Sequence, residues 1–216
     1  MKLRAITPIV VTDQELHRRR VRYDALAPRG VTIHLDNLTE GPDRLETTAQ
    51  IRDSEDLVYR EALGTDADAF DGIFLDCVLD PALEQLQAEC SIPVFGITRL
   101  VSTFLGSLDL RMAAVARNKA IAEELADRVD ASGWSSHLKE VLVLDLTLED
   151  IGDTDLWNRI VAEHVAAGDF DEVDTIINGC SAVEVHSADG PPLVDPTGLA
   201  LRLIGMGAEL LAGDGP

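Results

Sequence analysis

The chain has 216 residues, and 46% of them are hydrophobic, which is enough apolar material for one large domain or two small ones. No apolar run reaches the roughly 18 residues that a membrane-spanning helix needs, so the sequence excludes such a helix. The 39 acidic residues against 18 basic ones give a formal net charge of −21. Because the acids are dispersed, they would repel nucleic-acid phosphates and anionic membranes, and we expect neither as a partner.

The charge and the cysteine count also predict the surroundings of the protein. A dispersed acidic surface repels itself at low salt, and salt screens that repulsion, so we interpret the composition as adaptation to high salt. The alternative is an ordinary acidic cytosolic protein. Three cysteines, an odd number, and an N-terminus that continues from an apolar run into charges predict a reducing cytoplasm and no disulfide framework.

In the first half of the chain, apolar runs alternate with polar helical patterns. Gly30 marks a turn before the second run, Gly64 ends a long helix, and Pro81 occupies the first turn of the next helix. The expected strands are 3–11, 30–38, 71–77 and 92–98, and the expected helices are 13–26, 45–64 and 80–89.

The alternation starts again in the second half. Strands that are apolar throughout and alternate with helices indicate parallel sheets that are covered on both faces. Here the expected strands are 108–116, 139–146, 173–180 and 191–196, and the expected helices are 118–129, 153–168 and 197–213.

The two halves are related in detail. Cys77 and Cys180 lie 103 residues apart, and each follows an aspartate, Asp71 or Asp174, by six positions across an apolar strand. A proline-led apolar run comes after each cysteine. We therefore predict an α/β fold with two pseudo-symmetric, doubly wound parallel-sheet domains. The first comprises 1–98 plus 197–216, and the second 99–196.

The two cysteines are candidates for chemistry because parallel sheets bind ligands beyond the carboxyl ends of their strands, where both lie. A lone cysteine at such a place would be core filler, the role that we expect for Cys90. A strand end followed by a helix start would set each sulfur near backbone N–H groups and a helix dipole, which lowers a thiol pKa. Metal binding is disfavoured because C-x-x-C and H-x-x-x-H spacings are absent, and a redox pair is disfavoured by the long separation.

Two facing thiols suit the movement of a proton from one face of a carbon to the other. A thiolate takes the proton on one side while a thiol delivers one on the other, and each needs a pKa near the working pH. The intermediate is an enolate, whose oxygen could be held by backbone N–H groups after each cysteine, at Val78 to Asp80 and Ser181 to Val183. No cofactor is required if the carbon acid is already activated, and we expect no metal.

At this point the motifs resemble a known superfamily. "DCVLDPALE" at 76–84 keeps Cys77, Asp80 and Pro81 of a C-x-D-D-P-like segment, "NGCSA" at 178–182 carries Cys180, and "PPLVDPTGLALRL" at 191–203 has a proline-led strand, an aspartate and a long helix. The chain thus resembles the aspartate/glutamate/hydantoin racemase superfamily, and the hydantoin racemase branch most closely. The resemblance implies two pseudo-symmetric α/β domains that share one site, cofactor-independent racemisation, and the two cysteines as the acid/base pair.

The sequence departs from that family after the first strand. Hydantoin racemases usually have N-P-N-T there, whereas "TPIVVT" keeps Pro8 but has Thr7 and Ile9 in place of the asparagines. In the second half, Arg117 and Asn118 stand where hydroxyl residues are usual. Arg117 is either an anchor for a carboxylate, which would favour an amino acid or dicarboxylate, or a surface arginine that caps a strand end. The candidate substrate-binding residues are Thr7, Pro8, Val78, Asp80, Arg117, Asn118, Ser181 and Ala182.

The substrate is therefore expected to be a small molecule, either a hydantoin or an amino acid. Two other functions stay open: a superfamily relative that isomerises or decarboxylates a carboxylate, and a small-molecule binding protein without catalysis. Decarboxylating relatives tend to keep one cysteine, so the presence of two favours racemisation. The sequence leaves homo-oligomerisation open.

Overall fold

The computed structural model describes residues 1–186 and 190–212, and it confirms the predicted α/β class. The chain forms two compact units, each built on a four-stranded parallel sheet. One unit contains 1–45, 49–97 and the described residues from Thr197 onward, and the other contains 46–48 and 98–196. Gly213, the last residue of the expected closing helix, and the end of the expected first domain at 214–216 lie outside the described residues.

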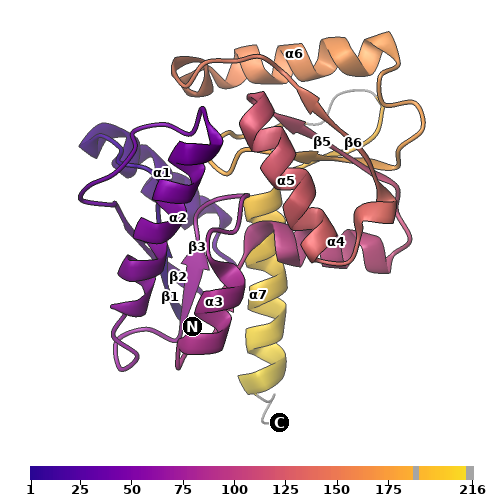
Figure 1. The fold of residues 1–216 in the computed structure, drawn as a ribbon. Helices are drawn as coiled ribbons and strands as arrows, with labels where there is room; N and C mark the ends of the chain where they lie inside the picture. Colours follow the sequence, from indigo (N-terminus) through magenta and orange to yellow (C-terminus); the bar gives the residue numbers. More distant parts are fainter. Residues whose placement is uncertain (187–189, 213–216) are drawn as a thin grey trace. The chain divides into compact units, whose positions relative to one another are not determined.

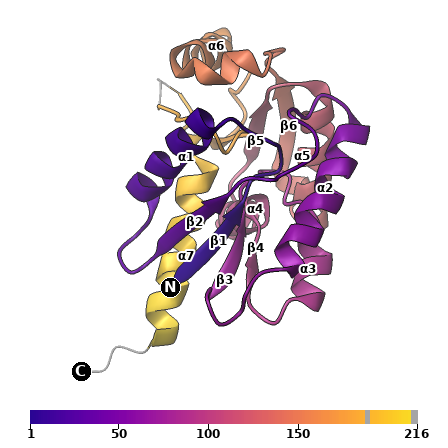
Figure 2. The ribbon, with the colours of Figure 1, turned by 90° about the vertical axis from the view of Figure 1, so that its left-hand side faces the viewer.

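The sheet of the first unit has the strand order β2-β1-β3-β4. One of its two inner strands, β3, is buried along its whole length, as expected for a strand covered on both faces. Figure 2 shows α1 and α7 on one face of this sheet and α2 and α3 on the other. The elements are β1 (Lys2–Ile6), α1 (Asp13–Leu26), β2 (Thr32–Asp36), α2 (Thr48–Leu63), β3 (Gly72–Leu75), α3 (Leu83–Glu89), β4 (Val94–Phe95) and α7 (Pro196–Ala212).

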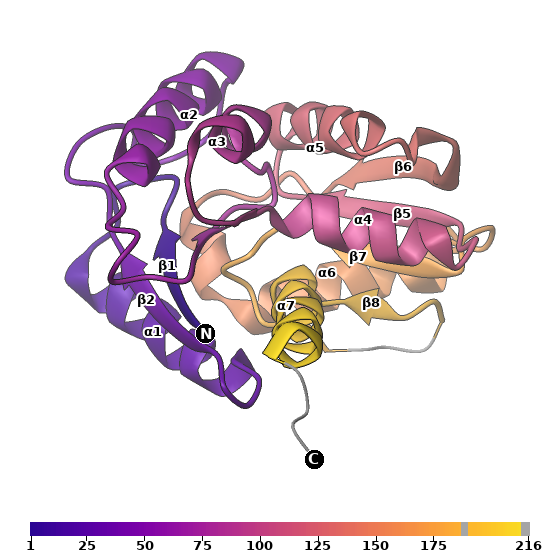
Figure 3. The same ribbon diagram turned by 90° about the horizontal axis from the view of Figure 1, so that it is seen from below.

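The sheet of the second unit has the order β6-β5-β7-β8, which can be followed in Figure 3. Helix α6 covers one face, and α4 and α5 cover the other (Figure 1). The elements are α4 (Ile97–Ser107), β5 (Met112–Ala116), α5 (Lys119–Ala131), the 3₁₀ turn η1 (Ser135–His137), β6 (Leu138–Val143), the 3₁₀ turn η2 (Glu149–Gly152), α6 (Thr154–Ala167), β7 (Thr175–Asn178) and β8 (Leu193–Val194).

Local sequence signals explain where several helices begin and end. Thr12, Asn118 and Asp153 cap the N-termini of α1, α5 and α6, because each side chain accepts a hydrogen bond from a backbone N–H of the first turn. Gly168 ends α6 with a φ of +85°, a left-handed conformation that glycine adopts without steric cost.

The two aspartates of the sequence repeat have the same structural role in the two units. Asp71 accepts a hydrogen bond from the backbone N–H of Lys2 at 2.6 Å, and its own N–H donates to the Lys2 carbonyl at 2.8 Å. Asp174 does the same with Arg111, at 2.9 and 2.8 Å. Each pair ties the start of the third strand of a sheet to the start of the first, so the repeat is one of structure as well as of sequence.

The structure also corrects parts of the sequence reading. The strand expected at 92–98 contains only Val94–Phe95, and the helix α4, which was not expected, begins at Ile97. Helix α3 begins at Leu83, so Pro81 precedes it and does not occupy its first turn. Among the described residues, no helix is long and apolar enough to cross a membrane.

Candidate active site

The first candidate residue, Cys77, follows β3 by two positions and is buried. Its backbone N–H donates to the Leu75 carbonyl at 2.8 Å, and its carbonyl accepts from the Asp80 N–H at 3.2 Å. The N–H of Leu79 points at the sulfur, with nitrogen and Sγ 3.4 Å apart. This donor favours negative charge on the sulfur. It comes from a turn, because α3 starts only at Leu83, so the predicted helix start directly after the strand is wrong here.

The turn after Cys77 is held in an uncommon conformation. Asp80 and Ala82 have φ values of +45° and +54°, in the left-handed region. The Ala82 N–H donates to Oε1 of Glu55 on α2 at 2.8 Å, which stabilises this path. Asp80 is buried against Gly96, where a Cβ would come within 2.6 Å of the Asp80 Cγ. Glycine at 96 therefore leaves the space that the Asp80 carboxylate occupies.

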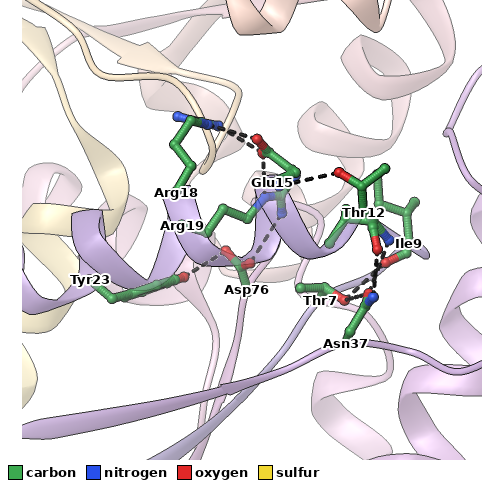
Figure 4. A network of polar contacts seen from close by, with 10 residues as sticks. Thr7, Ile9, Thr12, Glu15, Arg18, Arg19, Tyr23, Asn37 and Asp76 are labelled. Carbon is green, nitrogen blue, oxygen red and sulfur yellow. Dashed lines mark hydrogen bonds and ion pairs between the residues drawn. The ribbon is translucent and has the colours of Figure 1, made fainter.

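Asp76, directly before Cys77, belongs to a buried polar network (Figure 4). Its Oδ1 accepts a hydrogen bond from the Tyr23 hydroxyl at 2.6 Å, and its Oδ2 lies 3.2 Å from Nη1 of Arg19. Nε of Arg19 also donates to Glu15 at 2.8 Å. Burial and the Asp76 carboxylate raise the pKa of Tyr23 well above its usual range, so the hydroxyl stays protonated and keeps donating to Asp76.

The loop after β1 contains the predicted substrate residues Thr7 and Pro8. Side-chain hydrogen bonds hold this loop in its conformation. The Thr7 hydroxyl is buried, 2.9 Å from the Ile9 carbonyl and 3.2 Å from Oδ1 of Asn37 (Figure 4). Asn37 pairs with Val11 in both directions, accepting from its N–H at 3.0 Å and donating to its carbonyl at 2.7 Å. Thr7 thus has a structural role in this loop, and Asn37, which the sequence reading did not single out, holds it in shape.

The second candidate residue, Cys180, follows β7 by two positions and is half-buried. Gly179 fixes the backbone before it: its N–H donates to the Val115 carbonyl at 2.8 Å, and a Cβ would lie 2.2 Å from that oxygen. Asn178 is buried and its Nδ2 donates to the Cys180 carbonyl at 2.8 Å and to the Val183 carbonyl at 3.4 Å. The cysteine is therefore held by contacts to its backbone on both sides.

The segment after Cys180 differs from its counterpart in the first unit. Within the described residues, no helix follows Cys180 before α7, so the predicted helix dipole at this sulfur is wrong. Asn158 of α6 anchors the segment instead, because its Nδ2 donates to the Glu184 carbonyl at 3.0 Å and its Oδ1 accepts from the His186 N–H at 2.8 Å. Asn158 is another residue that sequence reasoning missed.

The two cysteines thus occupy the same position in two equivalent sheets, each two residues beyond the third strand of its unit. A family model for Asp/Glu/Hydantoin racemase matches residues 18–204 of the chain. The chain belongs to this family. The match covers both cysteine segments and most of each unit, in agreement with the sequence-based assignment.

Solved structures of racemases and related enzymes share the fold. Allantoin racemase from Klebsiella pneumoniae aligns with a TM-score of 0.80 and 17% sequence identity, over 98% of this chain and 88% of that one. Allantoin racemase from Pseudomonas fluorescens gives 0.81 and 16%, over 97% and 92%. Maleate isomerase from Pseudomonas putida gives 0.66 and 14%, over 96% and 92%. No curated protein sequence matches the chain closely enough to count as a relative.

In this racemase-family chain, the predicted residues Arg117 and Asn118 lie directly after β5, the strand beside β7. Arg117 is buried, with only 2% of its side chain exposed, so it is not a surface residue. Its Nη1 donates to Oε1 of Glu46 at 2.7 Å and to the Leu146 carbonyl at 3.3 Å. Nδ2 of Asn118 donates to Oε2 of the same Glu46 at 3.2 Å, while its Oδ1 caps α5 through the Ile121 N–H. The carboxylate of Glu46 therefore binds both Arg117 and Asn118.

The remaining thiol, Cys90, packs half-buried against the core of the first unit at the end of α3, as expected of core filler. Burial, followed by the charge of Glu89, raises its pKa. All three cysteines lie in the described part of the chain, and none forms a disulfide. In that same part, no three His, Cys, Asp or Glu side chains gather as a metal ion would need.

Proposed function

We propose that the protein is a cofactor-independent racemase or epimerase in which Cys77 and Cys180 are the acid/base pair. The observation that carries the proposal is their equivalence: each stands two residues beyond the third strand of a parallel sheet, at the edge where such sheets bind ligands. One thiolate removes the proton from a carbon next to a carbonyl, and the other thiol returns a proton to the opposite face.

The environment of each cysteine supports this chemistry. The Leu79 N–H within 3.4 Å of the Cys77 sulfur and the backbone contacts that fix Cys180 both reduce the freedom of the reacting atoms. A group held in place before the reaction needs less reorganisation to reach the transition state. Of the N–H groups predicted to bind an enolate oxygen, those of Leu79 and Asp80 donate within the turn, to the Cys77 sulfur and to the Cys77 carbonyl.

Among substrates, we favour a cyclic ureide, such as a hydantoin or allantoin, over a free amino acid. Arg117 would be the natural anchor for an amino-acid carboxylate, but it already pairs with Glu46 at 2.7 Å. A free carboxylate would have to displace this partner, whereas a neutral ring would not. The two allantoin racemases among the structural neighbours agree with this choice.

The proposal is tested by isotope exchange. The protein is incubated in deuterated, high-salt buffer with single enantiomers of 5-substituted hydantoins, allantoin, aspartate and glutamate, and exchange at the acidic carbon is followed together with optical rotation. We expect exchange and racemisation with the ureides. Failure of every substrate to exchange overturns the proposal, and preferential turnover of aspartate or glutamate overturns the choice of substrate.

Site variants assign the pair. Cys77→Ser and Cys180→Ser should each lower turnover by about 10² to 10⁴-fold, the usual contribution of a general acid or base. Cys90→Ser is the matched control, because it removes a half-buried thiol of the same chain that packs against the core of the first unit. Equal losses in all three variants would contradict the assignment.

A further inference from the structure

The two cysteine segments differ at one position in a way that separates their chemistry. Asp76 precedes Cys77, and the residue at the equivalent place before Cys180 is Gly179. Asp76 is 1% exposed, and its carboxylate is held by Tyr23 and Arg19. At Gly179 a side chain is excluded, because a Cβ would lie 2.2 Å from the Val115 carbonyl oxygen. The first thiol has a buried carboxylate directly before it, and the second cannot have one.

Each unit also has a carboxylate next to the end of its fourth strand. Asp80 in the first unit occupies the space where a side chain at Gly96 would stand, just after β4. In the second unit the residue that follows β8, the strand equivalent to β4, is Asp195, which is half-buried. Asp80 and Asp195 are thus two carboxylates that the units bring to this edge of their sheets from different segments. Asp76, in contrast, has Gly179 at the equivalent place in the second unit.

The cations and the other titratable groups do not reverse this difference. Arg19 pairs with Asp76, but it also pairs with Glu15, so the charge of Arg19 is shared between two carboxylates. Glu55 of α2 adds another carboxylate near the turn, through Ala82. Tyr23 is neutral, since burial and the neighbouring Asp76 raise its pKa well above the usual range.

Among the described residues near Cys180, several charged groups are also paired or exposed. Arg117, after the neighbouring strand β5, is paired with Glu46. Glu184 is exposed, and His186, whose backbone N–H is bound by Asn158, lies further along the same segment.

The burial of Cys77 acts in the same direction as the charge of Asp76, because both disfavour a thiolate at Cys77. Cys77 is buried, whereas Cys180 is half-buried. Loss of solvent disfavours a thiolate, and so does a like charge on the adjoining residue. The N–H of Leu79, 3.4 Å from the sulfur, favours a thiolate at Cys77 and so acts against these two effects.

We propose that Asp76 keeps the Cys77 thiol protonated near neutral pH, so that the resting protein holds Cys180 as the thiolate base and Cys77 as the acid. This inference rests on the proposed racemase function. In the forward step the Cα–H bond of the substrate breaks, its proton forms the S–H bond of Cys180, and the S–H proton of Cys77 passes to the opposite face of the carbon. The protein is then left with its two protonation states exchanged, and proton exchange with solvent restores the resting form.

The assignment is tested by the pH dependence of alkylation with iodoacetamide, which reacts with thiolates. Cys77 is measured in a Cys90→Ser, Cys180→Ser background, and Cys180 in a Cys77→Ser, Cys90→Ser background. We expect the midpoint of Cys180 to lie about one pH unit or more below that of Cys77, because burial and a neighbouring like charge each shift a pKa by this order. Equal midpoints, or a lower one for Cys77, overturn the proposal.

Variants of Asp76 and of its partner Arg19 should shift the alkylation midpoint of Cys77 in opposite directions. Asp76→Asn keeps the shape of the side chain and should lower the Cys77 midpoint by about one unit or more, while Arg19→Gln should raise it. Asp76→Glu retains the charge and should restore a high midpoint. Asp36→Asn, at the end of β2 and two strands away from β3, is the matched control and should leave both midpoints unchanged. An unshifted Cys77 midpoint in folded Asp76→Asn overturns the role of Asp76.

The comparison of the two cysteines needs no Asp76 variant, so it decides the resting state even if Asp76→Asn does not fold. Alkylation also needs no substrate, which separates this inference from the proposed function. Expected midpoints without racemisation would mean that the proposed function fails and the charge assignment holds. Racemisation that depends on both cysteines, combined with reversed midpoints, would mean that the proposed function holds and the charge assignment fails.

Discussion

Gly179→Ala offers a direct test of how the second cysteine is positioned. The added Cβ would lie 2.2 Å from the Val115 carbonyl oxygen and 3.2 Å from Cδ2 of Leu125, and the first of these atoms is backbone and cannot rotate away. The end of β7 must therefore move, which costs about 1–3 kcal/mol for overpacking. It also weakens the Gly179 N–H to Val115 hydrogen bond, worth about 0.5–1.5 kcal/mol.

The expected total of about 2–4 kcal/mol corresponds to a fall in Tm of roughly 5–15 °C for a chain of this size. Because Cys180 is the next residue, its sulfur should also shift, and a displacement near 1 Å costs about 10²-fold in rate. The assays are thermal unfolding by circular dichroism and turnover of the ureide that the wild type racemises.

Gly207→Ala is the matched control for this substitution. Gly207 lies inside α7, and among the described residues no heavy atom comes within 4 Å of a Cβ built on it, apart from its chain neighbours and the backbone of its own helix. Alanine there should stabilise the helix by up to about 1 kcal/mol. If Gly179→Ala is as stable as Gly207→Ala, or keeps full turnover, then the close approach of Gly179 to Val115 does not position Cys180.

Three further predictions concern acid stability, the second cysteine segment and salt. Hydrogen bonds from Arg111, chiefly from its side chain, lower the pKa of Asp174 from 3.8 to about 2, so the pair stabilises the fold fully above about pH 3.8 and this contribution is lost as the pH falls toward 2. Asp174→Asn should remove this part of the pH dependence in melts between about pH 2 and 5, and Arg111→Gln should reduce it, because the backbone N–H of residue 111 still donates to Asp174; an unchanged slope in both variants would contradict the linkage. Asn158→Ala should speed amide hydrogen exchange at His186, read by mass spectrometry, because the N–H loses its acceptor; protection equal to the wild type would show that Asn158 does not anchor the segment. Raising the salt concentration from about 0.1 M to about 1 M shortens the Debye length from roughly 10 to 3 Å and should raise Tm, since the chain carries a net charge of −21; a flat or falling Tm would remove the interpretation as salt adaptation.

Features that repeat along the chain were predictable from the sequence. The alternation of apolar runs and helical patterns predicts two parallel sheets, and the Asp71 and Asp174 repeat predicts their equivalence. Both cysteines were located at strand ends by the same reasoning. Such predictions succeed because burial on both faces of a sheet imposes a pattern on consecutive residues.

Features that depend on distant partners were not predictable. Helix α4 was missed because its sequence, with β-branched residues directly after a short strand, has no clear start signal of its own. Arg117 has the same sequence context whether it is exposed or buried, and only Glu46, 71 residues away, shows that its charge is satisfied. Asn37 and Asn158 likewise act on segments 26 to 28 residues away, as bonds to Val11 and His186.

The internal repeat makes these long-range differences informative. Two fully equivalent halves would give two equivalent thiols, which would share a single proton equally between them. The chain departs from equivalence where a side chain fits on one side and is excluded on the other, at Asp76 and Gly179. A buried carboxylate is costly to keep unless it is paired, and Tyr23 and Arg19 supply that pairing. Two side chains of α1, Tyr23 and Arg19, bind the one carboxylate of Asp76 next to Cys77. This arrangement is explained if Asp76 determines which thiol holds the proton.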